Sequence, residues 1–203
     1  MGDVLFYTLQ TFAPLYLMIV LLRFMLQMVR ADFYNPISQF VVKATHPLLA
    51  PLRRIIPGFR GLDIACLVLA FFVMFVTLLL ALSLVGLGDQ IANLIPNLIA
   101  WTLLGTATMF LNILFYALIA SVIISWVARG SRHPFVILIN QLIEPLLLPI
   151  RRLLPDLGGL DISPIFAFFA INILQRFVIF PIANMTVGEA PQAVISVVQA
   201  FVI

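Results

Sequence analysis

Long apolar runs alternate with short polar segments along the whole chain. Four runs are long enough to cross about 30 Å of membrane hydrocarbon, since a helix rises about 1.5 Å per residue. They cover residues 5–29, 63–86, 99–127 and 162–185. The first is the weakest because it contains several polar residues, including Arg23. The pattern predicts an all-α membrane protein with about four transmembrane helices.

The polar segments between the runs repeat at a spacing of 98 residues. Of the 18 positions in residues 47–64, 11 are identical in residues 145–162. An internal repeat of this kind determines the architecture before any single residue does. We expect two repeats, 1–98 and 99–203, each made of a helix, a basic linker and a second helix. Two spans return the chain to its starting side, so the copies should be parallel, related by an axis along the membrane normal.

The composition supports a membrane protein, because 64% of the residues are hydrophobic and only 9% are charged. The mean hydropathy is +1.19, which is far above the range of soluble domains. The first residues lack a basic segment and an evident cleavage site, so we expect no cleaved signal peptide. The single cysteine, Cys66, cannot form an intramolecular disulfide and is expected to be a small buried hydrophobe.

Positive charge is concentrated in the two linkers, which hold nine of the eleven lysines and arginines. The opposite side has acidic residues and no cation outside the spans. Because lysine and arginine bias sets orientation, both linkers should be cytoplasmic and both termini outside. A nucleic-acid-binding role would need this charge on a folded soluble surface, which the sequence does not provide.

Each linker is apolar enough to form an amphipathic helix in the plane of the membrane interface. Asn35 can cap the first of these helices, with Pro36 at its first position. Pro47 and Pro51, and their equivalents 98 residues later, are expected to interrupt the helices. The physical reason is that proline lacks an N–H and its ring clashes with the preceding turn.

The linker residues also carry a family resemblance, through a pattern of prolines, an arginine pair, a glycine and an aspartate. The segments 30–36 and 47–63, with their copy in 125–161, resemble the YggT family of bacterial inner-membrane proteins. The resemblance covers nearly the whole chain and implies a two-domain, multi-pass bacterial member. It also implies a more distant relation to single-repeat proteins of chloroplasts and Gram-positive bacteria. Relatives are linked to osmotic tolerance, to division and envelope organisation, and to assembly of cofactor-bearing membrane complexes, so no single activity follows.

The arginine pairs Arg53-Arg54 and Arg151-Arg152 are candidate sites for anionic lipid head groups or a protein partner. A cytoplasmic basic cluster is attracted to anionic lipid by about 1 kcal/mol per charge. The alternative is that these residues only fix the topology and extend their charged ends to the membrane surface.

Asp63 and Asp161 precede the second span of each repeat. An aspartate in this position can accept hydrogen bonds from free amides and complements the positive end of the helix. We therefore expect helix caps, and the alternative is a cation site near the axis between the repeats.

Arg176 lies about 22 Å along the fourth run, flanked by Asn172 and Gln175. Its repeat equivalent is Leu78, so the duplication does not require a charge there. A cation inside a span is costly and by default indicates a functional or structural partner. No acidic residue lies within the predicted spans, so candidate partners are carbonyls, Asn112, lipid phosphate or another protein. The alternative is an arginine that only extends toward the surface.

We find no catalytic motif, and His46 and His133 are not repeat equivalents, so neither an enzyme nor a cofactor or metal site is expected. The leading hypothesis is a non-catalytic scaffold or assembly and envelope-organisation factor acting at the duplicated basic linkers. Its expected partners are anionic lipids, a membrane protein or further copies of the chain, and no nucleic acid. The alternative is a small transporter or channel in ion or osmotic homeostasis.

Overall fold

The computed structural model describes residues 2–58, 61–127, 130–154, 161–188 and 192–202, and these residues form helices without any strand. The first repeat contains α1 (Gly2–Met28), α2 (Pro36–Ile55) and α3 (Ile64–Leu84), and a 3-10 turn, η1 (Gly88–Gln90), follows. The second contains α4 (Ile91–Val127), α5 (Pro134–Leu153) and a last span made of α6 (Ser163–Ile173), the π-helical turn η2 (Leu174–Ile179) and α7 (Phe180–Val187). A short helix, α8 (Gln192–Phe201), ends the described chain.

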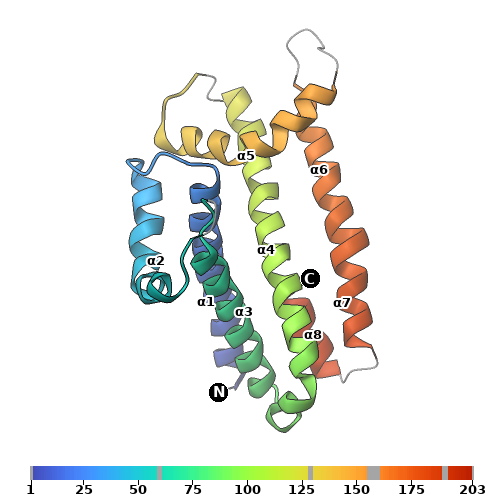
Figure 1. Cartoon of the computed structure of the whole chain (residues 1–203). Coiled ribbons are helices and arrows are strands. Elements are labelled where there is room, and N and C mark those ends of the chain that lie inside the picture. Colours follow the sequence, from blue (N-terminus) through green and yellow to red (C-terminus); the bar gives the residue numbers. More distant parts are fainter. Residues whose placement is uncertain (1, 59–60, 128–129, 155–160, 189–191, 203) are drawn as a thin grey trace.

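The prediction of an all-α multi-pass membrane protein is confirmed. Among the described residues, five helical segments are long and apolar enough to cross a membrane, judged by length and composition. Four of them correspond to the predicted spans, and the fifth is α5, which the sequence assigned to a linker. In Figure 1, α5 lies across the ends of α4 and α6 and not beside them. We call this the linker end of the bundle.

The two repeats run in the same direction. In Figure 1, α1 and α4 both rise toward the linker end, and α3 and the last span both descend from it. The packing is nevertheless not that of a closed symmetric pair, because α3 packs against α4 while the last span packs mainly on α4, α5 and α8. The α3–α4 contact has no comparable counterpart between the last span and α1. The first three spans therefore pack around one another, and the last span lies at one edge, against α4.

The core is densest where α1, α3 and α4 meet, and α8 completes it. The helix α8 folds back toward the bundle and packs against α3, α7 and α1. Its Val194, Val197 and Val198 are buried. Gly105 of α4 lies close to both neighbours, because a Cβ there would lie 3.3 Å from the carbonyl oxygen of Phe201 in α8 and would displace the flexible end of Met74 in α3. The sequence analysis did not predict α8, since ten residues are too short to span a membrane.

In place of the expected break at the linker prolines, α2 and α5 each continue through both of them. Figure 1 shows the axes of both helices changing direction in their second halves. The prolines of each linker are four residues apart, so they lie on one face of the helix, and all four are exposed. The carbonyls that they leave without N–H partners therefore lie on the outer face, and the helix bends there without ending.

The two linker helices are oriented differently. The first half of α2 runs alongside α1, whereas α5 crosses the end of the bundle (Figure 1). The expectation that both lie in one interface plane therefore fits α5 better than α2. The N-termini of the two linkers meet, because the side-chain amide of Asn35 donates a hydrogen bond to the carbonyl of Pro134 over 2.7 Å.

Candidate functional site: the duplicated linkers and the Arg176 cavity

Asn35 and His133 occupy equivalent positions at the start of the linker helices. The side-chain oxygen of Asn35 accepts a hydrogen bond from the amide of Ile37 over 2.9 Å. In the second repeat, Nδ1 of His133 accepts from the amide of Phe135 over 3.3 Å. Each side chain caps a helix whose first residue is proline. His133 is thus part of a helix cap.

In the first repeat, Arg53 joins the end of α2 to the start of α3. Its guanidinium forms an ion pair with Asp63, and Nε donates to the carboxylate over 3.1 Å. Asp63 is only 3% exposed and caps α3 by accepting from the amide of Cys66. Burial alone would raise the pKa of Asp63, but the hydrogen bonds from Arg53 and Cys66 outweigh it and hold the pKa below its ordinary value.

In the second repeat, Arg151 makes the equivalent link, but in a more open setting. Its guanidinium reaches Asp161 at 2.8 Å and Glu144 at 3.0 Å, and all three side chains are at least 41% exposed. Asp161 lies two residues before Ser163, the first residue of α6, and accepts a hydrogen bond from the amide of Ser163 over 2.9 Å. Burial would raise the pKa of Asp161, but hydrogen bonds from Ser163 and Arg151 lower it below its ordinary value.

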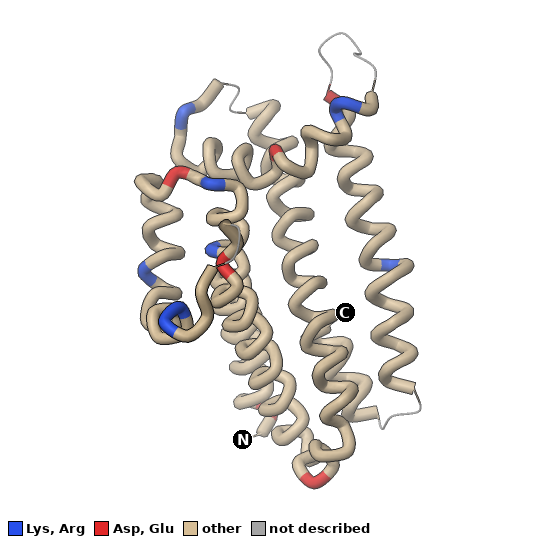
Figure 2. The backbone as a smooth tube through the Cα atoms, in the orientation of Figure 1, with Lys and Arg blue, Asp and Glu red and all other residues tan. Residues whose placement is uncertain are grey.

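The second arginine of each pair is placed differently from the first. Arg54 and Arg152 are exposed, and neither makes a hydrogen bond or ion pair with another described residue. Figure 2 shows positive residues along α2 and α5, while the turn at the opposite end of the bundle carries an acidic residue. The second arginine of each pair therefore has no partner among the residues that the structure describes. Arg60 and Arg129, also counted as linker cations, lie outside the described residues.

The aspartates do not form a cluster that could hold a metal ion. Asp63 and Asp161 each face the arginine of their own repeat, ten residues earlier in the chain. Among the described residues, no group of three histidine, cysteine, aspartate or glutamate side chains is close enough to share an ion.

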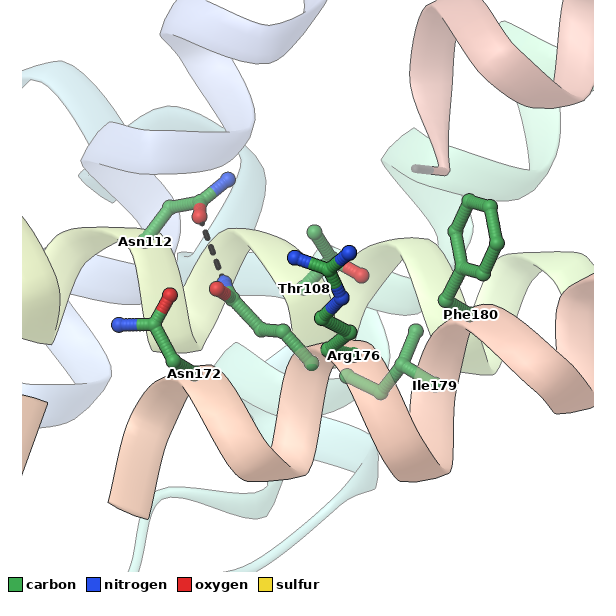
Figure 3. A pocket seen from close by; sticks show the side chains of 7 residues that line it. Thr108, Asn112, Asn172, Arg176, Ile179 and Phe180 are labelled. Carbon is green, nitrogen blue, oxygen red and sulfur yellow. Dashed lines mark hydrogen bonds between the residues drawn. The ribbon is translucent and has the colours of Figure 1, made fainter. Parts of the chain in front are cut away.

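A cavity of about 420 Å³ lies between α4 and the last span. It contains the predicted intramembrane polar residues, and Figure 3 shows the side chains of α4 facing those of the last span across it. Gln175 donates a hydrogen bond to Oδ1 of Asn112 over 2.8 Å. The residues that line it are Thr108, Asn112, Asn172, Gln175, Arg176, Ile179 and Phe180.

Arg176 is exposed at this cavity and makes no hydrogen bond or ion pair with another described residue. Asn112, considered from the sequence as a partner of Arg176, bonds instead to Gln175. The amide of Asn172 donates to the carbonyl of Phe168, within its own helix. Arg176 lies in the π-helical turn η2, an arrangement that is often found at functional sites.

Arg23 is a buried arginine to which the sequence analysis assigned no role. It lies in α1, is 4% exposed, and donates from Nη1 to the carbonyl of Val42 over 2.8 Å and to Oγ1 of Thr45 over 2.7 Å. Both acceptors belong to α2, so Arg23 holds the first linker helix against the first span. The available signal was a cation within an apolar run, the same signal that singled out Arg176.

The CCB3/YggT family model matches the chain twice, over residues 2–84 and 100–182. The chain belongs to this family. The two matched segments are offset by the same 98 residues as the sequence repeat, and together they contain both linkers and the cavity.

Several relatives of this YggT-family protein extend over most of its length. It is 57% identical over 180 residues to an uncharacterised protein of Pseudomonas aeruginosa, covering 89% of this chain and 90% of the relative. It is 40% identical over 192 residues to the uncharacterised protein YggT of Escherichia coli K12, covering 94% and 93%. A Vibrio alginolyticus protein is 39% identical over 179 residues, covering 87% and 95%. No solved structure matches the chain.

Proposed function

We propose that this protein is a non-catalytic membrane scaffold or assembly and envelope-organisation factor that binds anionic head groups or a protein partner through its two linkers. One observation carries the proposal. In each linker the first arginine is neutralised by an aspartate, while the next arginine is exposed and has no acidic partner among the described residues. The first arginine thereby positions the linker, and the second is available for binding.

The residues that follow these free arginines support the same proposal. Ile55 and Leu153 are repeat equivalents directly after Arg54 and Arg152, and they are 80% and 84% exposed. A cation beside a large exposed apolar side chain suits the boundary between head groups and acyl chains. Both copies present this combination on an amphipathic helix.

The proposed location is the bacterial inner membrane, with both linkers cytoplasmic and both termini outside. We expect Asp89→Cys, in a Cys66→Ala background, to react with a membrane-impermeant maleimide added from outside. Lys43→Cys and Arg132→Cys should react only after the membrane is opened. External labelling of Arg132→Cys would contradict the proposed orientation.

The lipid-binding proposal is tested by the double variant Arg54→Ala/Arg152→Ala. In nanodiscs, its preference for phosphatidylglycerol over phosphatidylcholine should fall by about thirtyfold, because two charges contribute about 1 kcal/mol each. Retained lipid is quantified by native mass spectrometry. The matched control is Lys43→Ala/Arg132→Ala, which removes the same charge from the linkers but leaves the duplicated motif intact.

If both double variants lose the same amount of lipid preference, the preference depends on the total charge of the linkers, and the duplicated motif has no special role in it. If neither loses any, but Arg54→Ala/Arg152→Ala fails to complement a deletion strain under osmotic stress, the linkers bind protein and not lipid.

A second candidate function, a small transporter or channel for ions or osmolytes, is favoured by the polar cavity at Arg176. This alternative requires solute flux through the protein. Flux of potassium, chloride or phosphate into proteoliposomes, reduced by Arg176→Leu, would support transport. Absence of flux for all three ions would leave the scaffold proposal in place.

A further inference from the structure

We infer that the cavity at Arg176 receives one carboxylate carried on a transmembrane helix of a different membrane protein. This inference rests on the proposed scaffold function, since it names the kind of partner that such a scaffold would bind. It places that contact within the membrane, far from the linkers.

The depth of Arg176 is the first argument. It is 13 residues after the start of α6 and 11 before the end of α7, which corresponds to about 20 Å and about 17 Å along the helix. Lipid phosphates lie at the membrane surface, outside the roughly 30 Å hydrocarbon core. An anion at this depth is best supplied by an acidic side chain on a membrane-spanning helix.

The charge balance is the second argument. The six acidic residues that the structure describes lie at helix ends, in the linkers or in turns, and Asp156 and Glu189 fall between the spans in the sequence. A second copy of the chain therefore cannot bring a carboxylate to the depth of Arg176. The complementary charge must come from a different protein.

The lining of the cavity is the third argument, because it offers hydrogen-bond donors without a competing anion. Arg176 has a free planar guanidinium, which suits a carboxylate geometrically. Asn112 accepts from Gln175 through its oxygen, which leaves its amide nitrogen as a donor. The hydroxyl of Thr108 is buried and has no hydrogen-bond partner among the described residues. A carboxylate in the cavity could accept hydrogen bonds from these donors.

The first repeat shows that the fold itself does not require these polar residues. The equivalents of Asn172, Gln175 and Arg176 are Met74, Thr77 and Leu78, which are 3%, 4% and 0% exposed. The same region of the first repeat is therefore packed and largely apolar, whereas in the second repeat it is hollow and polar. The difference is specific to the second copy.

The surface around the cavity is suited to a partner helix. The last span lies at the edge of the bundle and has no extensive contact with α1 or α3. Ten large apolar side chains of this span are exposed, and five of them recur at helical spacing as a stripe next to Arg176. They are Phe166, Phe169, Ile173, Phe177 and Phe180. The cavity is large enough for a side chain but far too small for a helix, so a partner helix would lie on the stripe and insert its carboxylate.

The test uses a synthetic single-span peptide of leucine and alanine with one central glutamate, and a second peptide with glutamine in its place. Association with the full-length protein is measured by fluorescence energy transfer in phosphatidylcholine nanodiscs at pH 8. The wild type should bind the glutamate peptide at least about tenfold more tightly than the glutamine peptide. Arg176→Leu and Arg176→Gln should bind the two peptides equally, and Arg176→Glu should prefer a peptide with a central lysine.

Val178→Leu is the matched control, because Val178 is an exposed neighbour of Arg176 that belongs neither to the cavity lining nor to the stripe, so this variant should retain the preference for glutamate. Thermal unfolding of each variant establishes that it is folded.

Equal binding of both peptides by the wild type, or a preference that persists in Arg176→Leu, overturns the inference. Oleate that binds the wild type as tightly as the glutamate peptide, and is lost in Arg176→Leu, assigns the cavity to a lipid and also overturns it. The lipid preference of Arg54 and Arg152 is measured separately, so failure here is distinguishable from failure of the scaffold proposal.

Discussion

Two arginines lie within the apolar helices of this protein, and their surroundings are opposite. Arg23 in the first repeat is buried and donates to Val42 and Thr45 of the adjacent linker helix. Arg176 in the second repeat is exposed at a cavity and has no partner among the described residues. The sequence signal is the same for both, a cation inside a span. What separates a structural arginine from a candidate binding residue is whether the fold supplies acceptors for its donors.

The largest expected effect is at Arg23. Arg23→Ala removes two hydrogen bonds from a charged group and leaves a void between α1 and α2, so the free energy of unfolding should fall by about 3 kcal/mol. Chemical unfolding in detergent, followed by circular dichroism, measures this value. A loss below about 1 kcal/mol would mean that Arg23 is not the main connection between the two helices.

The arginine–aspartate links should also differ between the repeats, with the larger contribution to stability in the first repeat. Arg53→Ala leaves the buried carboxylate of Asp63 without its cation and should cost about 2 kcal/mol of unfolding free energy. Arg151→Ala should cost no more than about 1 kcal/mol, because its partners are largely exposed and solvent screens the pair. Equal losses in the two variants would show that the difference in burial has no energetic consequence.

Acidification should destabilise the protein through the same carboxylates. The pKa values of Asp63 and Asp161 are lowered in the folded protein, so the stabilisation is fully present above the unfolded pKa of about 3.9. It is lost as the pH falls below that value toward the folded pKa. Unfolding measured from pH 7 to pH 3 should show this decline, and Asp63→Asn should reduce it more than Asp161→Asn.

The smallest effect on stability is expected at Arg176. Arg176→Leu removes a charge that has no partner within the described chain, so the unfolding free energy should change by no more than about 0.5 kcal/mol. Complementation of a deletion strain under osmotic or envelope stress should nevertheless be impaired. Arg176→Lys should restore it only in part, because an ammonium group cannot reproduce the planar donors of arginine. Full complementation by Arg176→Leu would show that the residue is incidental.

The sequence predicted the parts of the fold that depend on local pattern. The four spans, their parallel arrangement and the caps at the start of the linker helices follow from hydrophobic length, repeat spacing and residues such as Asn35. The bend at Pro47 and Pro51 was expected as a break, because helix disruption by proline is a local rule. Whether the helix continues depends on where the freed carbonyls point, which is determined by the tertiary packing.

The candidate site was predicted less completely. Arg176, Asn172 and Gln175 were identified as polar residues within a span, and the structure places all three at one cavity. The contact between Gln175 and Asn112 and the π-helical turn η2 had no sequence signal. The different burial of Asp63 and Asp161 could not be predicted either, because the two copies have nearly the same local sequence and differ in what packs around them.

The position of α8 determines when the packing of the first helices can be completed during synthesis. Residues 192–202 leave the ribosome after all the helices that they contact, yet Phe201 packs edge-to-face on Phe6 of the first helix, with ring centroids 5.8 Å apart. The N-terminal half therefore completes its packing only when the last helix has been synthesised. A chain that stops after α7 would expose the surfaces of α1 and α3 that Val194, Val197 and Val198 cover.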